Sequence, residues 1–197
     1  ERSAPPRHGA VIDDRAFFAG DAFADQTRKS RSLLAIEVGF QAVTDGFVET
    51  VAGTMAEFDL ARGSVCLEIT ETAAVTNLAD AAVFIGQVRE AGVKVALDDF
   101  GAGASSFGYL KALPVDYLKI DGQYIKNLVT DALDDAAVRC FVDVAQLMGI
   151  KTVAEFVDST EALNRLKLIG VDYAQGYLVH RPEPIAGLLA VTTRSAD

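Results

Sequence analysis

The sequence predicts an α/β fold, specifically a (β/α)8 TIM-like barrel that is incomplete at its N-terminal end. Two observations carry this prediction. Short β-rich runs alternate with longer helical patterns from Leu33 onward, and polar residues stand at the ends of many different runs. Strands that alternate with helices form a parallel sheet covered on its faces. An open doubly wound sheet and a barrel both fit this alternation. The positions of the polar residues distinguish between the two folds.

Six runs are expected to be strands, and three of the stretches between them read clearly as helices. The strand candidates are 34–38, 65–69, 93–97, 117–120, 152–154 and 173–178. The helical stretches are 78–90, 132–148 and 160–168; Gly92, Gly149 and Gly170 follow them, where a C-terminal glycine cap is expected. A closed barrel needs eight strands and typically about 250 residues. Residues 1–33 contain no convincing strand, so the shortfall lies at that end.

Polar residues at the strand ends favour the barrel over the open sheet. A barrel draws its catalytic residues from many strand ends, whereas an open sheet concentrates its site at one switch point. The polar residues at or near the ends of the expected strands are Glu68, Asp98, Asp99, Lys119, Glu155 and Gln175.

Two adjacent carboxylates open the glycine-rich stretch Asp98-Asp99-Phe100-Gly101-Ala102-Gly103. Successive residues of a strand point to opposite faces, so both carboxylates can serve one site only where the strand ends and turns. Paired carboxylates at such a point suit a two-metal centre, with glycines that let the backbone approach a phosphate. A solvated Asp-Asp turn is the alternative for this segment taken alone.

The bulk composition limits the function classes. The 197 residues are 50% hydrophobic and 23% charged, which is typical of one globular domain. A net charge of -10 argues against DNA binding through a basic surface. No apolar run approaches the roughly 20 residues that cross a bilayer, and no signal-peptide pattern opens the chain, so we expect a cytoplasmic domain without membrane insertion. Cys66 and Cys140 are both expected to be buried thiols.

With these residues in view, the chain resembles the EAL family of cyclic di-GMP phosphodiesterases. The resemblance runs from about Leu34 to Pro184, within a single domain over 1–197 that has a poorly matching part, 1–33, and a C-terminal tail, 185–197. Five motifs appear in the family's order: Leu67-Glu68-Ile69-Thr70-Glu71, Asp98-Asp99-Phe100-Gly101-Ala102-Gly103, Leu118-Lys119-Ile120-Asp121, Ala154-Glu155-Phe156-Val157-Asp158 and Gln175-Gly176-Tyr177-Leu178.

The resemblance implies a role for each matched residue. Glu68 and Asp98 would hold one Mg2+ or Mn2+ ion and Asp99 a second, with the ions polarising the phosphodiester and activating water. Lys119 would orient that water or balance the carboxylates, and Glu155 would be a further ligand, acting through water. The resemblance also implies that Gln175 lies near the nucleotide and that Asp98 contacts the substrate. Glu71 would anchor the mobile loop 100–106, and Asp158 stands where the family usually has a second glutamate.

Each of these residues also has a plainer interpretation. Lys119 alone would be a structural partner of nearby Asp121. Glu71 alone would be solvated or would cap the following segment. Phe100 and Tyr177 read as core or wall residues.

Two departures from the family pattern concern the metal site. The Glu-Ala-Leu strand is absent: Pro6-Arg7-His8-Gly9-Ala10-Val11-Ile12 resembles the loop that follows that strand, and Glu1 is a poor match to its glutamate. Glu37 stands where the family usually has a metal-binding asparagine, so it adds a charge at a metal ligand position. The interval from Phe18 to Glu37 is also shorter than the family's by more than a helix.

Three functions follow as alternatives. The first is a phosphodiesterase domain that opens cyclic di-GMP to linear pGpG with two divalent metals. The second is a degenerate EAL domain that acts as a cyclic di-GMP receptor or protein-interaction module without hydrolysis. The third is another metal-dependent (β/α)8 enzyme, since fold alone does not determine function. The resemblance also implies a homodimer through the barrel and further signalling domains in the parent protein.

Overall fold

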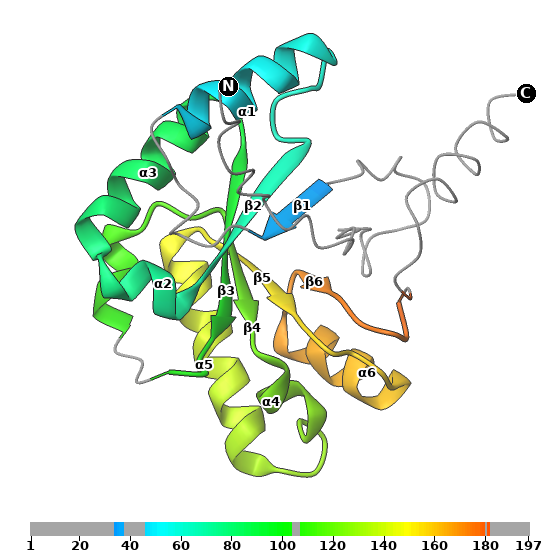
Figure 1. The fold of residues 1–197 in the computed structure, drawn as a ribbon. Coiled ribbons are helices and arrows are strands. Elements are labelled where there is room, and N and C mark those ends of the chain that lie inside the picture. The colour runs from blue at the N-terminus through cyan, green and yellow to red at the C-terminus, as the bar shows by residue number, and fades with distance from the viewer. Residues whose placement is uncertain (1–33, 38–45, 104–106, 180, 182–197) are drawn as a thin grey trace, which may run out of the picture.

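A computed structural model of the chain describes residues 34–37, 46–103, 107–179 and 181. Expectations about 1–33, about the tail 185–197 and about the tip of the glycine-rich loop lie outside these residues. The described residues form an α/β fold built on one six-stranded, fully parallel sheet (Figure 1). No helix among them is both long and apolar enough to span a membrane.

Each strand of the sheet pairs with the next strand in the chain, in the order β1-β2-β3-β4-β5-β6. An open doubly wound sheet reverses its strand order at a switch point, and this sheet has no reversal. The sheet is therefore wound in one direction, as in a barrel, and the predicted fold class is confirmed. The strands are β1 (Leu34–Glu37), β2 (Val65–Thr70), β3 (Lys94–Phe100), β4 (Tyr117–Ile120), β5 (Lys151–Ala154) and β6 (Tyr173–Ala174).

The helices lie between the strands and cover the outer face of the sheet (Figure 1). The bounds of α3 and α5 are those that the sequence predicts, and α6 extends one residue further. Gly149 and Gly170 cap α5 and α6 in the left-handed conformation, at φ of 72° and 96°. The helical segments are α1 (Phe47–Glu57), α2 (Glu71–Thr76), α3 (Leu78–Glu90), the 3-10 turn η2 (Phe107–Ala112), α4 (Gly122–Lys126), α5 (Ala132–Met148) and α6 (Thr160–Ile169).

Two strands end more than one residue away from the predicted position. β3 continues to Phe100 rather than ending at Leu97. β6 stops at Ala174 rather than Leu178, because the chain leaves the sheet and pairs instead with the segment after β5. There the Val157 N–H donates to the Gln175 carbonyl at 2.9 Å, and the Leu178 N–H donates to the Val157 carbonyl at 3.1 Å.

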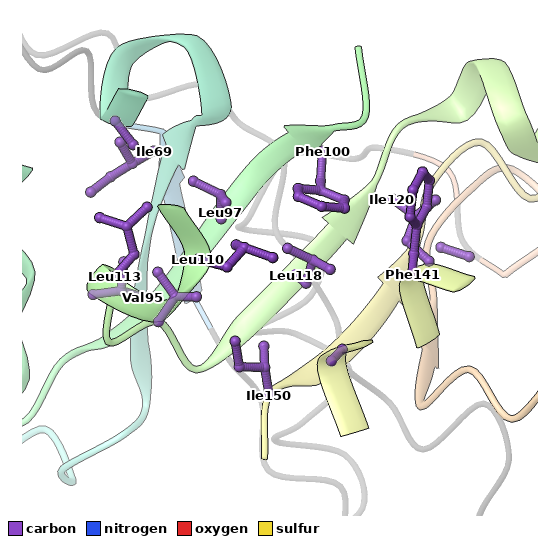
Figure 2. Packing of buried hydrophobic residues seen from close by; sticks show 14 of the residues in the cluster. Ile69, Val95, Leu97, Phe100, Leu110, Leu113, Leu118, Ile120, Phe141 and Ile150 are labelled. Carbon is purple, nitrogen blue, oxygen red and sulfur yellow. The ribbon is translucent and has the colours of Figure 1, made fainter. Parts of the chain in front are cut away.

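The outward-facing residues of the strands pack under the helices. Alternation along β2 sends Leu67 and Ile69 to this side, where they join a core that includes Leu97, Leu118 and Ile120 (Figure 2). Such burial contributes about 25 cal/mol per Å² of apolar surface, which is the main stabilising term of the fold.

The inward-facing residues form a second, smaller cluster of Cys66, Ala96 and Val153, against which Tyr117 and Tyr173 pack. A sheet with apolar clusters on both faces is typical of parallel barrels, whose interior is filled by side chains.

Two burial predictions were wrong. Cys66 is buried as expected, but Cys140 is exposed, since it lies on the face of α5 opposite Val138, Phe141 and Val142. Tyr177 is 66% exposed, because β6 ends before it and the chain has left the barrel wall. Phe100, in contrast, is fully buried.

Candidate metal centre

The polar residues form one layer on the inner face, directly above the small apolar cluster. Side chains two residues apart on a strand share a face. Each member of the inner cluster is followed two positions later by a polar residue, either within the last three residues of the strand or just beyond its end. These pairs are Cys66 and Glu68, Ala96 and Asp98, Tyr117 and Lys119, Val153 and Glu155, and Tyr173 and Gln175.

Lys119 lies at the centre of this layer. Its Nζ is 2.9 Å from Glu68 Oε2, 2.7 Å from Asp98 Oδ1 and 2.8 Å from Glu155 Oε1. The Lys119 side chain is only 4% exposed, so these contacts are little screened by solvent. Three carboxylates from β2, β3 and the end of β5 therefore converge on one buried ammonium.

Burial and the neighbouring charges together set the pKa values of this cluster. Burial disfavours the ammonium of Lys119, but the attraction of Glu155, Glu68 and Asp98 outweighs it and holds the Lys119 pKa above its usual value. Burial raises the pKa of Glu155 to about 7, with the negative charges of Asp98 and Glu68 adding to it and Lys119 opposing it. More negative charge is gathered here than one lysine neutralises.

A bulge allows both neighbouring carboxylates of β3 to serve the site. The pairing of β3 with β4 shifts register between Leu97 and Phe100. Asp99, inside this shift, takes a left-handed conformation with φ of 55°. Asp98 Oδ1 accepts a hydrogen bond from the Asp99 N–H at 3.0 Å. In a regular strand the two side chains would point to opposite faces, so the bulge is what brings them to one side.

Asp98, Asp99 and Glu155 form a group that could hold a metal ion. One carboxylate oxygen from each lies within 4.8 Å of the others. Hard divalent cations such as Mg2+ prefer oxygen ligands, so this donor set fits such an ion.

Glu71 lies at the start of α2, is buried, and reaches the glycine-rich loop. Glu71 Oε2 accepts from the Gly101 N–H at 2.9 Å, and its Oε1 accepts from the Tyr109 hydroxyl at 2.5 Å. Burial, together with this hydrogen bond to Glu71, raises the Tyr109 pKa well above its ordinary value. Glu71 is therefore neither solvated nor a simple cap.

The other predicted site residues differ in how closely they approach the centre. Gln175 Oε1 is buried and has no hydrogen-bond partner within the described residues. Asp158 is exposed just before Ser159, the N-cap of α6. Glu37 pairs with Glu68 in the ladder between β1 and β2, so the backbone places it beside the carboxylate layer.

The structural pairing of Lys119 with Asp121 does not occur. Asp121 instead caps α4, where its Oδ1 accepts from the Gln123 N–H at 2.7 Å. Lys119 and Asp121 are two residues apart, but β4 ends between them at Ile120, so their side chains diverge.

Two tyrosines beside the site were not singled out by sequence reasoning. Tyr109 contacts Glu71 from η2, and the Tyr124 hydroxyl donates to the Gly101 carbonyl at 2.8 Å from α4. Both elements are too short for a periodic pattern, which explains why the sequence offered no signal.

A cavity of about 420 Å³ lies at the opposite end of the strands, lined in part by Lys94, Asp116 and Lys151. It is distinct from the carboxylate layer, because Lys94 and Lys151 begin β3 and β5 whereas the carboxylates end them.

Comparison with known proteins identifies the chain's relatives. The family model described as the EAL domain matches residues 15–182. Cyclic di-GMP phosphodiesterase PdeB of Shewanella oneidensis is 49% identical over 142 residues, which is 72% of this chain but only 17% of that protein's length.

Solved structures agree with this assignment. The crystal structure of the EAL domain of Mycobacterium smegmatis DcpA superposes with a TM-score of 0.77 at 41% identity, covering 83% of this chain and 73% of that chain. A manganese and cyclic di-GMP complex of Klebsiella pneumoniae BlrP1 gives a TM-score of 0.69 at 28% identity, covering 75% of this chain and 38% of that chain.

Proposed function

This chain belongs to the EAL domain family, and we propose from this that it hydrolyses one phosphodiester bond of cyclic di-GMP to release linear pGpG with the help of divalent metal ions. The observation that carries the proposal is the layer of Glu68, Asp98 and Glu155 around Lys119, with Asp99 beside it. An acidic site binds a dianionic substrate only if cations lie between them, and this site is acidic. The chain spans less than a fifth of the length of the PdeB relative, so the proposal concerns this domain only.

The chemistry of the donor set supports a metal site. Asp98, Asp99 and Glu155 supply carboxylate oxygens to this site. Glu68, which contacts Lys119, supplies a further carboxylate. We propose Mg2+ or Mn2+, with Glu37 as a further ligand from the end of β1. Such ions supply Lewis acidity toward the phosphodiester and lower the pKa of water.

Residues of the chain itself balance the charge of the site and contact the nucleotide or water. The buried Lys119 ammonium directs its three N–H donors at Glu68, Asp98 and Glu155, so it keeps these carboxylates together and offsets part of their negative charge. Glu155 would bind an ion as a carboxylate, and because burial raises its pKa to about 7 in the metal-free protein, it would release its proton when the ion binds. Gln175 Oε1, which is buried and has no hydrogen-bond partner in the described part of the chain, accepts a hydrogen bond from the nucleotide or from water.

A receptor without hydrolysis is the second candidate. It is favoured by Glu37, which the ladder places opposite Glu68 and which carries a charge where the family has a neutral asparagine. Cyclic di-GMP binding is common to both candidates, so turnover has to separate them.

The deciding experiment combines metal binding with product release. Calorimetry with Mn2+ is expected to show binding that the double variant Asp98→Asn/Asp99→Asn loses, because neutral amides bind hard cations less strongly than carboxylates. The matched control Asp143→Asn/Glu161→Gln removes the same charge from exposed positions and should bind Mn2+ normally. Unchanged affinity in the Asp98/Asp99 variant would exclude the pair as ligands.

Product release is measured as pGpG formed from cyclic di-GMP with Mg2+ or Mn2+. Turnover by the wild type supports the enzyme. Retained nucleotide binding with no turnover would refute the enzyme and leave the receptor. Dimerisation through the barrel, attached signalling domains, a cytoplasmic location and loop anchoring by Asp158 stay predictions.

A further inference from the structure

Asp99 holds a backbone conformation that needs support from its surroundings. A non-glycine residue in the left-handed region is strained and persists only where neighbouring contacts impose that conformation. At φ of 55°, Asp99 is such a residue, and the direction of its carboxylate depends on the peptide units that follow it. The contacts that hold those units therefore control one proposed metal ligand.

The Gly101 peptide is held from both sides. On the β2 side its N–H donates to Glu71 Oε2 at 2.9 Å, and Glu71 is itself oriented by the Tyr109 hydroxyl. On the β4 side the Gly101 carbonyl accepts from the Tyr124 hydroxyl at 2.8 Å. The anchoring role that the family resemblance gives Glu71 covers only the first side.

The Tyr124 ring is held in place by packing against other aromatic rings. Its ring packs edge-on against Phe141 of α5, with centroids 5.2 Å apart, and Phe141 packs edge-on against Phe100 at 5.1 Å. The ring also covers Gly101 closely, since a Cβ built there would lie 2.7 Å from Tyr124 Cε2. Asp99 is thus followed first by Phe100, which is held in this aromatic cluster, and then by Gly101, whose N–H donates to the Glu71 carboxylate and whose carbonyl accepts from the Tyr124 hydroxyl.

We infer that Tyr124, together with Tyr109 acting through Glu71, is a positioning residue that sets the Asp99 carboxylate for metal binding. The inference rests on the proposed function only for the reaction that the metal would serve. Neither tyrosine has to touch substrate. Each acts on Asp99 through the backbone of Gly101.

The test removes one hydroxyl and keeps the ring. Tyr124→Phe is expected to weaken Mn2+ binding about five- to tenfold, which is the effect of one lost hydrogen bond on a ligand's position. Tyr109→Phe should have an effect of the same size. Tyr117→Phe is the matched control, because it makes the same change one layer below the carboxylates, among Cys66, Ala96 and Val153.

Turnover gives a second readout that a purely structural role would not change. For Tyr124→Phe, kcat at low Mn2+ should fall about fivefold and recover at high Mn2+, while KM for cyclic di-GMP stays within about twofold of wild type. Circular dichroism establishes that each variant is folded at the assay temperature. A loss of thermal stability with unchanged Mn2+ affinity would overturn the inference.

The two proposals fail in different ways. If the wild type binds Mn2+ but releases no pGpG, the proposed function fails. The Mn2+ affinities of Tyr124→Phe and Tyr117→Phe then still test the positioning role of Tyr124. If the wild type is active and Tyr124→Phe binds Mn2+ as tightly as Tyr117→Phe, the positioning role of Tyr124 is refuted and the proposed function stands.

Discussion

Lys119 shows how one residue can both stabilise the fold and serve the site. Its ammonium is the shared partner of Glu68, Asp98 and Glu155, so Lys119→Met leaves three carboxylates facing one another. We expect the metal-free variant to lose about 3–5 kcal/mol of unfolding free energy, as when one partner of a buried ion pair is removed. Thermal unfolding measured with and without Mn2+ checks this, and the ion should stabilise the variant more than the wild type.

Activity provides a second measurement on the same variant. Turnover should fall by about a hundredfold or more, which is the usual effect of losing one fixed charged group from a reacting centre. Lys111→Met, an exposed change on η2, is the control and should alter neither property. A Lys119→Met protein that is as stable as wild type without metal would show that the ion pairs contribute little.

Glu37 is predicted to determine how much activity the site retains. Glu37→Asn removes one negative charge at the position that pairs with Glu68 in the ladder and introduces the amide that the family usually carries. We expect turnover to rise by about tenfold, which corresponds to roughly 1.4 kcal/mol of transition-state stabilisation. The measurement is pGpG release, with Glu49→Gln on α1 as a charge-matched control. Unchanged turnover would mean that the Glu37 carboxylate simply replaces the asparagine oxygen.

At the scale of elements, the turn after β6 depends on Gly176. Its φ is 154°, and a Cβ there would lie 2.3 Å from both the N and the O of Val157. Gly176→Ala should therefore lower the unfolding free energy by about 3 kcal/mol, since backbone strain and overpacking each cost about 1–3 kcal/mol. Chemical denaturation measures the change.

Gly86 is the matched control for this substitution. It lies inside α3, and a Cβ there would meet nothing within 4 Å. Gly86→Ala should raise the unfolding free energy by about 0.5–1 kcal/mol, because alanine restricts the unfolded chain and favours a helix. Equal effects of the two substitutions would contradict the turn geometry described here.

At the scale of the whole molecule, the metal-free domain should become more stable on mild acidification. The pKa of Glu155 is raised from its ordinary value of 4.5 to about 7 in the folded protein, mainly by burial. The folded state therefore binds this proton more tightly than the unfolded state, and stability rises as pH falls from about 7 toward 4.5. Glu155→Gln should flatten this rise, as measured by thermal unfolding across that range.

Asp135 acts in the opposite direction and at lower pH. Its hydrogen bonds from Arg165 of α6 and Arg139 of α5 lower its pKa to about 2. That stabilisation is present above the unfolded value of 3.8 and is lost as pH falls through about 2. Asp135→Asn should therefore be slightly less stable than wild type at pH 7 and should approach it at pH 2. A difference independent of pH would argue against the ion pairs.

The sequence by itself determined the fold class, the order of the elements and the identity of the polar layer. The helices α3 and α5 have their predicted bounds because amphipathic spacing and glycine caps are local properties of the chain. Glu68, Asp98, Lys119 and Glu155 could be placed together because a parallel barrel brings all strand ends to one edge. Elements that lack such a pattern, α4 and η2 among them, could not be predicted.

Only the tertiary structure decided how those residues meet. Lys119 binds Glu68, Asp98 and Glu155 across three other strands rather than its near neighbour Asp121. The bulge at Asp99 and the hold of Glu71 and Tyr124 on Gly101 likewise depend on contacts between segments distant in the chain. Local sequence encodes spacing along one element, whereas packing between elements sets the direction of each side chain and the charge around it.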